Sequence, residues 1–231
     1  MPSFPRPGFP TPGFPTPGFV VGLAAEARIA ARFGYPVRAG GGTPAGAAAA
    51  ARRLIEDGAT ALVSFGLAGG LDPALRPGSL LIPSIILSDG ETWRADPTLA
   101  EAFGGLTPHT ILGGAEIAAN AAAKRHLHAS TQAHAIDLES GAVARVAAAH
   151  GLPVMVIRAI CDPAEMDLPP AALIALDQAG GIGLLPVLRS VLLQPNQIPG
   201  LLALARDAAL ARRALIALAK WFQADRRTSS R

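Results

Sequence analysis

The sequence predicts an α/β fold: a single-domain three-layer sandwich around a central mixed, largely parallel sheet. Short apolar runs alternate along the chain with Ala-rich helical segments, as in proteins whose helices cover both faces of a sheet. The 231 residues, 50% of them hydrophobic, can bury a substantial core as one domain. Glycine-rich segments and acidic residues gather where apolar runs end, which is the sheet edge at which such folds bind ligands.

The first 18 residues form a proline-rich leader that repeats a Pro-Gly-Phe-Pro-Thr unit. Recurrent proline favours extended backbone and removes the amide donors of a helix, so we expect residues 1–18 to be disordered. A proline ligand for a partner protein is the alternative. Residues 19–23 predict the first strand and residues 24–32 a helix. Glu26 falls in the first turn of that helix, where a lone glutamate most often only offsets the helix dipole.

A glycine-rich segment after the next predicted strand is a candidate pocket wall. Residues 45–57 predict an Ala-rich helix, and residues 61–65 predict the strand that follows it. This strand runs into a loop of sequence GLAGGL, residues 66–71, whose small residues Ala68 and Gly69 would let a flat ligand approach the backbone. A tight turn that needs glycine for its backbone angles is the alternative.

The middle of the chain gives weaker signals. Residues 80–87 predict a short strand pair around Pro83. The four histidines within residues 102–134 lack the spacing to acids or thiols that metal ligands show. We therefore expect these histidines at the surface and predict no metal site.

Residues 135–162 bring two carboxylates to one end of the predicted sheet. Glu139 opens a helical segment that a Gly-Leu-Pro turn ends. Residues 154–160 are apolar and rich in Val and Ile, as expected for a strand buried on both faces. Asp162 follows this strand, beside Cys161, at the carboxyl edge where open α/β sheets bind ligands. We therefore expect Asp162 in the pocket.

The composition excludes several classes of function. The formal charge is +3, and the first two thirds of the chain hold no compact run of Lys and Arg, so we expect no nucleic-acid partner. Cys161 is the only cysteine, which excludes an intrachain disulfide and a cysteine-rich zinc site. A reducing, cytoplasmic location fits this cysteine content.

The C-terminal residues 181–231 predict a Leu- and Arg-rich helical extension of the domain formed by residues 19–180. Leucines interleave there with Arg206, Arg213 and Lys220, a pattern that fits amphipathic helices lying on an acidic membrane surface. Apolar runs stay shorter than the roughly 20 residues of a membrane span. Helices that pack on the domain or on a dimer partner are the alternative.

Three motifs occur in a fixed order along the chain. They are GLAGGL at residues 66–71 with Pro-Gly-Ser at 77–79, Asp-Leu-Glu-Ser at 137–140, and Arg-Ala-Ile-Cys-Asp at 158–162. This succession resembles the nucleoside phosphorylase/nucleosidase superfamily, and its methylthioadenosine/S-adenosylhomocysteine nucleosidase branch most of all. The resemblance implies a nucleoside phosphorylase-like catalytic domain in residues 19–180. It also implies an N-glycosyl hydrolase or phosphorylase acting on purine nucleosides, and a homodimer.

The resemblance implies roles for three acids. Asp162 matches the acid that protonates or hydrogen-bonds N7 of the purine as the base leaves. Glu139 matches the carboxylate that accepts the ribose hydroxyls and stabilises the cationic sugar. Glu26 resembles the N-terminal glutamate that positions the attacking water.

Further residues take substrate-binding positions by the same resemblance. Leu138 stands where the family commonly has a methionine against the sugar, and Ala68, Gly69 and Cys161 stand in the pocket motifs. Leu67 departs from the pattern, because the nucleosidases commonly carry a small hydroxyl residue there. We find no paired arginines at the phosphate-binding positions of the purine phosphorylases, so hydrolysis is the first choice.

The tail and the motif variants resemble the hopanoid-associated nucleoside phosphorylase subgroup. This implies release of adenine from adenosylhopane to give ribosylhopane in hopanoid lipid biosynthesis, with Leu168 and the leucine-rich tail forming an apolar channel. The alternatives are a methylthioadenosine/S-adenosylhomocysteine nucleosidase, a phosphorolytic purine nucleoside phosphorylase and a non-catalytic nucleoside-binding module. We expect no cofactor, with phosphate as a co-substrate in the phosphorolytic case. A lipid-linked substrate fits peripheral membrane contact through the C-terminal region.

Overall fold

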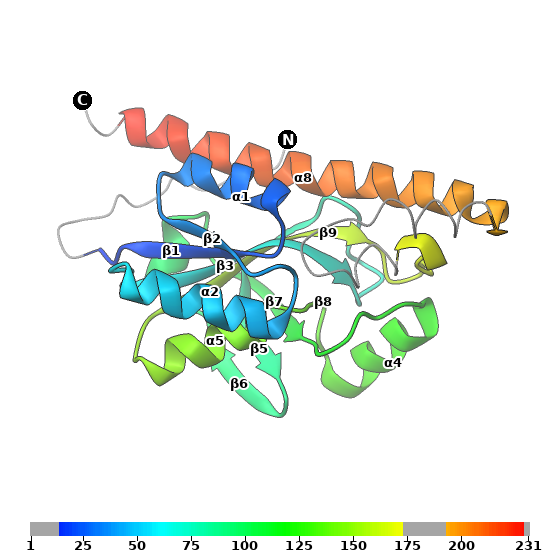
Figure 1. Ribbon diagram of the computed structural model, residues 1–231, viewed down its shortest axis with the longest axis horizontal. Helices are drawn as coiled ribbons and strands as arrows, with labels where there is room; N and C mark the ends of the chain where they lie inside the picture. The colour runs from blue at the N-terminus through cyan, green and yellow to red at the C-terminus, as the bar shows by residue number, and fades with distance from the viewer. Residues whose placement is uncertain (1–13, 173–192, 229–231) are drawn as a thin grey trace.

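The computed structural model describes residues 14–172 and 193–228 and confirms the α/β fold, with a mixed, largely parallel sheet between helices (Figure 1). The strands are β1 (Pro17–Val21), β2 (Val37–Ala39), β3 (Ala61–Gly70), β4 (Leu80–Leu81), β5 (Pro83–Ser88), β6 (Glu91–Arg94), β7 (Thr107–Gly113), β8 (Ala135–Asp137) and β9 (Val154–Asp162). The helices are α1 (Ala24–Ala30), α2 (Pro44–Glu56), α3 (Pro97–Glu101), α4 (Ala121–Thr131), α5 (Ser140–Ala149) and α8 (Ile198–Thr228), with the 3-10 turns η1 (Ala31–Phe33) and η2 (Pro195–Gln197).

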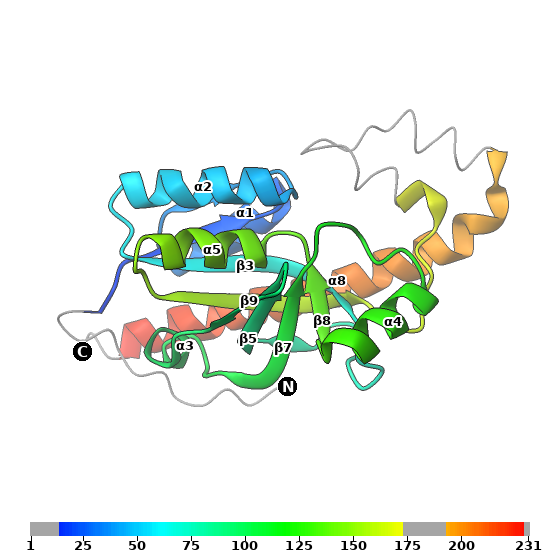
Figure 2. The same cartoon turned by 90° about the horizontal axis from the view of Figure 1, so that it is seen from below.

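Side chains alternate across the strands, so each face of the sheet has its own core. From β1, Phe19 and Val21 belong to the core that α1 and α8 cover, whereas Val20 belongs to the core that α2 and α5 cover. Figure 2 shows α2 and α5 on one side of β3 and α8 on the other. The layers are therefore helix, sheet and helix, as predicted.

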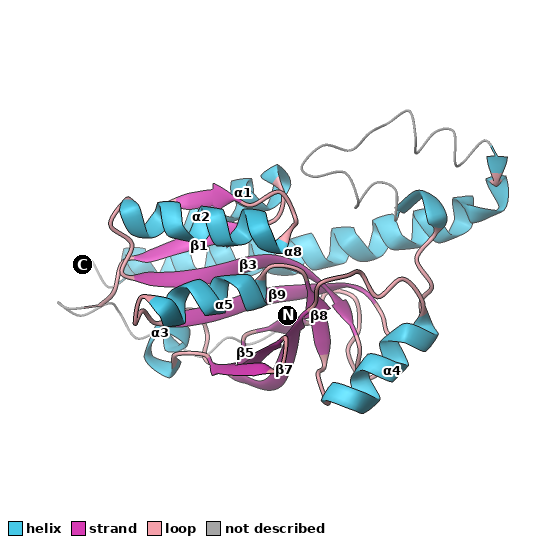
Figure 3. Cartoon of the chain, turned by 60° about the horizontal axis from the view of Figure 1, so that its bottom comes forward, coloured by secondary structure: helices cyan, strands magenta, loops and turns pink. Residues whose placement is uncertain are grey.

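The long strand β3 organises the curved sheet, which Figure 3 shows from another side. Its first half pairs in parallel with β1, up to the pair Val21 and Phe65, and its other edge pairs in parallel with β9. Beyond β1, the antiparallel strand β8 takes over the first edge at Gly69 and Gly70. Among the described strands, none pairs with residues 66–68 on that edge, which leaves a gap where side chains can reach the backbone of β3.

Two sequence expectations need correction at strand ends. The GLAGGL segment is not a loop, because residues 66–70 continue β3. Its small residues allow the strand to bend, with a register shift against β9 between Ala68 and Gly69. β9 likewise continues beyond the predicted residues 154–160, so that Asp162 is its last residue. Both differences arise because pairing between β3 and β9 continues to the pocket.

The first strand begins at Pro17, so the last two residues of the predicted leader belong to the sheet. Proline is tolerated at the first position of a strand. Gly18 is required by close packing, because a β-carbon there would lie 2.9 Å from the β-carbon of Leu54 on α2. Residues 1–13, which hold most of the predicted leader, lie outside the described residues.

The helix α8 confirms the helical character predicted for the C-terminal segment, although residues 173–192 lie outside the described part. Its second half packs into the core, where Leu215 and Phe222 are buried. The Phe222 ring stacks on Phe103 at 5.0 Å and meets Phe33 edge-on at 5.2 Å. Packing on the domain, the alternative left open by the sequence, is thus correct for this half. Among the described residues, none of the helices has the length and hydropathy to span a membrane.

The expectation of surface histidines in residues 102–134 is wrong for three of the four. His109, His128 and His134 are partly buried between β7, β8 and α4, with the His109 and His134 rings 5.1 Å apart. His134 Nδ1 accepts a hydrogen bond from the backbone N–H of Thr110, which explains its burial. Within residues 14–172 and 193–228, no three His, Cys, Asp or Glu side chains gather as metal ligands would.

Candidate active site

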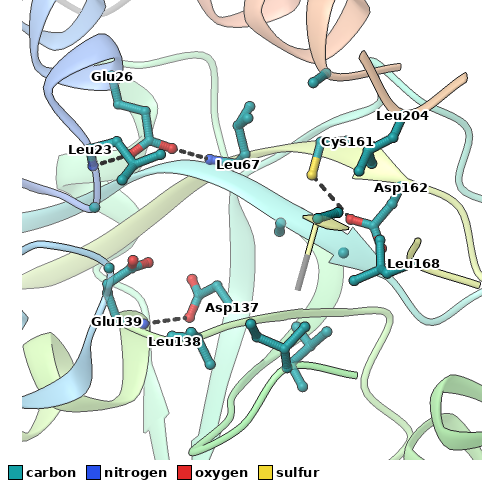
Figure 4. Close-up of a pocket in the computed structure, with 18 of the residues that line it drawn as sticks. Leu23, Glu26, Leu67, Asp137, Leu138, Glu139, Cys161, Asp162, Leu168 and Leu204 are labelled. Carbon is teal, nitrogen blue, oxygen red and sulfur yellow. Dashed lines mark hydrogen bonds between the residues drawn. The ribbon is translucent and has the colours of Figure 1, made fainter. Parts of the chain in front are cut away.

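A cavity of about 520 Å³ lies at the gap beside β3, where β1, β8 and β9 end. This volume is within the range of about 300–1,000 Å³ that small-molecule sites occupy. The residues that line it include all those named as site residues from the sequence: Glu26, Ala68, Gly69, Leu138, Glu139, Cys161 and Asp162. Figure 4 shows Glu26, Glu139 and Asp162 around this cavity, each from a different segment of the chain.

Glu26 is buried and joins α1 to the sheet. Its Oε2 accepts a hydrogen bond of 2.8 Å from the backbone N–H of Leu23, and its Oε1 accepts one of 3.0 Å from Leu67 (Figure 4). Leu67 lies two residues beyond Phe65, the last β3 residue that pairs with β1. Glu26 therefore does more than offset the dipole of its helix, because it fills the gap in the sheet with a carboxylate.

Glu139 precedes α5 and pairs with an arginine buried in the sheet. Arg158 of β9 is 1% exposed, and its Nη2 donates to Glu139 Oε2 at 2.9 Å and to Ser64 Oγ at 2.8 Å. Its Nε donates to Asp137. Burial raises the pKa of Glu139 to about 7, with Asp137 and Glu26 adding to the rise and Arg158 opposing it.

Two of the carboxylates converge above Gly22, just after β1. A β-carbon at Gly22 would lie 2.6 Å from Glu139 Oε1 and 3.2 Å from Glu26 Oε2. At Gly66 a β-carbon would lie 2.4 Å from Arg158 Nη1. Only glycine fits at these two positions, because charged side chains occupy the space that a β-carbon would need. The arrangement places two acids within the reach of one small ligand.

Asp162 closes the other end of the cavity. Its carboxylate lies over Gly69, where a β-carbon would approach Oδ2 to 3.2 Å. Oδ1 accepts a hydrogen bond of 3.1 Å from the Cys161 thiol (Figure 4), and Oδ2 accepts one of 2.6 Å from Lys124 Nζ. Burial raises the pKa of the Cys161 thiol well above its ordinary value, so the thiol keeps the proton that it donates.

Lys124 is the functional candidate that the sequence analysis missed. It lies on α4 in the stretch that gave weak signals, and nothing in the spacing of an Ala-rich helix marks one position as buried. One signal was available. Among the 20 Lys and Arg residues of the chain, Lys124 and Lys220 are the lysines, so a lysine in this arginine-dominated sequence is unusual.

The remaining walls of the cavity are mostly apolar and come from three separate segments. Leu23 follows β1, Leu168 and Ala172 follow β9, and Leu204 and Ala208 belong to α8. Leu168 and the α8 residues Leu204 and Ala208 thus line the same cavity. Among the described residues that line the cavity, the one basic side chain is Arg212, which is exposed on α8.

The site offers distinct chemistry at its two ends. Glu26 and Glu139 provide acceptors at one end, and Glu139 changes its charge near neutral pH. Asp162 provides a fixed carboxylate at the other. Between them, the small residues Ala68 and Gly69 leave room for a flat group. The arrangement can stabilise positive charge at one end of a bound molecule and a proton at the other.

Comparison with known proteins gives a family and a fold. The phosphorylase superfamily matches the chain over residues 35–104 and 104–179. A search of the curated proteins gave no significant match. Among solved structures, futalosine hydrolase of Helicobacter pylori is similar with a TM-score of 0.64 and 16% identity, over 90% of this chain and 96% of that one.

Two nucleosidase structures are similar to the same extent. The 5′-methylthioadenosine/S-adenosylhomocysteine nucleosidase of Helicobacter pylori, solved with butyl-thio-DADMe-Immucillin-A, has a TM-score of 0.65 and 16% identity, over 90% of this chain and 96% of that one. The S-adenosylhomocysteine nucleosidase of Streptococcus pyogenes, solved with 5-methylthiotubericidin, has a TM-score of 0.63 and 16% identity, over 90% and 97%. At this identity the likeness establishes the fold.

Proposed function

The chain belongs to the phosphorylase superfamily, and on that premise we propose that it is an enzyme that cleaves the N-glycosidic bond of a 5′-substituted adenosine. The observation that carries the proposal is the cavity bounded by Glu26, Glu139 and Asp162. The names of the similar structures, nucleosidases and a futalosine hydrolase, support a nucleoside as the substrate.

Breaking this bond develops negative charge on the purine and positive charge on the ribose. The proposed roles divide accordingly. Asp162 faces the base and, as the carboxylate paired with Lys124, accepts a hydrogen bond from N7 once N7 has taken up a proton from solvent. Glu139, in its ionised form, accepts the ribose hydroxyls and stabilises the cationic sugar, while Leu138 packs against that sugar. Ala68 and Gly69 lie along the ring plane, and Cys161 orients Asp162 through its thiol.

The nucleophile in this proposal is water, held and deprotonated by Glu26. Backbone N–H groups at the start of a helix would otherwise be a ready site for phosphate. Here the N–H groups of Leu23 and Leu67 donate to the Glu26 carboxylate, whose negative charge opposes a bound anion. Hydrolysis is therefore favoured over phosphorolysis.

The finer proposal is that the substrate is adenosylhopane and the product ribosylhopane, in hopanoid lipid biosynthesis. It is supported by the apolar wall that Leu168, Leu204 and Ala208 build beside the acids, because a large hydrocarbon group at the 5′ carbon needs such a surface. The resemblance to the hopanoid-associated subgroup supports the same choice. Methylthioadenosine and S-adenosylhomocysteine, named for the similar structures, are the competing substrates.

We also propose that α8 touches an acidic membrane surface. Its exposed residues Leu202, Arg206, Leu210, Arg213 and Lys220 fall within a stripe of about 80° around the helix. Leucines that remain exposed among cations match an interface of acyl chains and anionic headgroups. The same helix lines the cavity through Leu204 and Ala208, which lie on its opposite side.

One experiment tests substrate and nucleophile together. Adenosylhopane, methylthioadenosine and S-adenosylhomocysteine are each incubated with the full chain, with and without inorganic phosphate, and the products are identified by mass spectrometry. The proposal expects free adenine and ribosylhopane in both conditions. A ribose 1-phosphate product would identify a phosphorylase, preference for methylthioadenosine would identify the generic nucleosidase, and binding without turnover of any of the three would overturn the enzymatic role.

A further inference from the structure

The Lys124 ammonium is buried behind Asp162, outside the set of residues that line the cavity. Its side chain is 0% exposed. Lys124 Nζ donates to Asp162 Oδ2 at 2.6 Å, to the Pro163 carbonyl at 2.9 Å and to the Met166 carbonyl at 3.0 Å. An ammonium group has three hydrogens, so these contacts use every donor. Lys124 is therefore unable to donate to a ligand itself, and any effect on a reaction passes through Asp162.

Stability alone is a poor explanation for this pair. Removing two charges from water costs several kcal/mol per ion, and their attraction repays this only with very good geometry. An apolar pair of similar volume often does as well in a protein core. The pair instead involves an acid that lines the cavity, Asp162, whose other oxygen is held by Cys161.

The surroundings fix Lys124 in place. The segment after Asp162 is tied to α4 at both ends, by Lys124 itself and by Asp167, whose Oδ1 accepts from the backbone N–H of Ala121 at 2.8 Å. The Asn120 side chain caps the same helix by accepting from Ala123 at 2.8 Å. The Lys124 ammonium is thus held in place both by α4 and by the segment that follows Asp162.

We propose that Lys124 is a positioning residue of the reaction: it fixes the orientation of the Asp162 carboxylate and offsets its charge, so that the acid meets the base in one geometry. The inference rests on the proposed function and adds a residue to it. Both Asp162 oxygens are held, Oδ1 by the Cys161 thiol and Oδ2 by Lys124, which restricts rotation of the carboxylate and preorganises it.

The test compares Lys124→Met, which keeps the length of the side chain without its charge, with Lys124→Arg, which keeps the charge. Arg125→Met is the matched control, because Arg125 is the adjacent, exposed residue of α4. Adenine release from the best substrate is measured across substrate concentration. We expect Lys124→Met to lower kcat at least 30-fold with KM within threefold, Lys124→Arg to lose less than tenfold, and Arg125→Met to match the wild type.

Repeating the Lys124→Met substitution in the Asp162→Asn protein distinguishes an effect on the orientation of Asp162 from an effect on folding. In Asp162→Asn, which removes the charge that Lys124 balances, Lys124→Met is expected to change the residual rate less than twofold. This double variant buries no unpaired charge, so we expect it to fold, and its circular dichroism spectrum tests whether the chain folds without Lys124. Equal losses in both backgrounds, or equal losses for Lys124→Met and Lys124→Arg, would overturn the inference. An active wild type with an equally active Lys124→Met removes this inference alone, whereas an inactive wild type removes the proposed function as well.

Discussion

The Glu26 carboxylate accepts a 3.0 Å hydrogen bond from the backbone N–H of Leu67, which joins the first turn of α1 to the end of β3. The contact exists because β3 extends beyond the end of β1. The backbone N–H of Leu67 therefore has no partner on β1 and can donate to a side chain. A main-chain donor that could have bound phosphate is thereby occupied by a carboxylate.

The first prediction concerns the nucleophile. Glu26→Gln is expected to lower kcat for adenine release by about 100- to 1,000-fold, because a neutral amide is unable to take the proton of water. In the wild type, the rate is expected to stay within a factor of two when inorganic phosphate is added. Glu56→Gln, at an exposed glutamate of α2, is the control. A wild-type rate that rises in proportion to phosphate would contradict the prediction.

The second prediction concerns the acid at the base. Asp162→Asn is expected to lower kcat by at least about 100-fold. It also leaves Lys124 buried without its counter-charge, so we expect the free energy of unfolding to fall by about 3 kcal/mol. Circular dichroism and denaturant titration check that the variant is folded in the assay. Asp89→Asn, at an exposed aspartate, should change neither quantity, and full activity of Asp162→Asn would remove Asp162 from the mechanism.

The third prediction concerns pH. Because the pKa of Glu139 is raised to about 7 and the ionised form is the one proposed to bind ribose, kcat/KM should fall roughly tenfold per pH unit below 7. Glu139→Gln should lose both activity and this acid limb. If kcat/KM still falls below pH 7 in Glu139→Gln, the fall is caused by the titration of another group.

The same shift has a consequence for stability. A carboxyl whose pKa is higher in the folded protein binds its proton more tightly there than in the unfolded chain. Its contribution is complete below the ordinary value of 4.5 and is lost as pH rises through about 7. The free energy of unfolding should therefore decline across this window more steeply in the wild type than in Glu139→Gln.

The fourth prediction concerns the 5′ substituent. Ala208→Trp, which fills the apolar wall from α8, is expected to lower kcat/KM for adenosylhopane at least tenfold while that for methylthioadenosine stays within threefold. The matched control is Ala205→Trp, at an exposed position of the same helix. Equal losses on both substrates would show that this wall does not receive the 5′ group.

The fifth prediction concerns the membrane. The wild type is expected to bind vesicles that contain anionic lipid more than vesicles of neutral lipid, with binding weakened by salt. Arg206→Glu with Arg213→Glu should abolish the difference in a sedimentation assay, whereas Arg52→Glu with Arg53→Glu, on α2 and across the sheet, should not. Equal loss in both pairs would indicate attraction to net charge alone.

Local sequence patterns were sufficient for the parts of the site that depend on strand ends. Asp162 and Glu139 could be predicted because each follows or precedes a regular element whose apolar pattern is clear, and such ends meet at one sheet edge. The role of the GLAGGL segment in the pocket was predicted, but its strand conformation was not. Glycines disfavour strands on average, and pairing with β9 overrides that preference here.

The partners of these acids could not be predicted, because they depend on register between distant segments. Lys124 reaches Asp162 across 38 positions of sequence, and Arg158 reaches Ser64 across 94. Neither contact leaves a periodic trace in the chain. The burial of Phe222 was missed for the same reason, since the aromatic residues that receive it, Phe33 and Phe103, lie far away in sequence.

The helix α8 serves two ends of the molecule at once: Leu204 and Ala208 shape the binding cavity, while Leu215 and Phe222 complete the central core. A deletion in α8 meant to open the site for other substrates would also remove Phe222, which packs on Phe33 and Phe103. Substrate preference in this protein is therefore more readily changed by single substitutions along α8 than by shortening the helix.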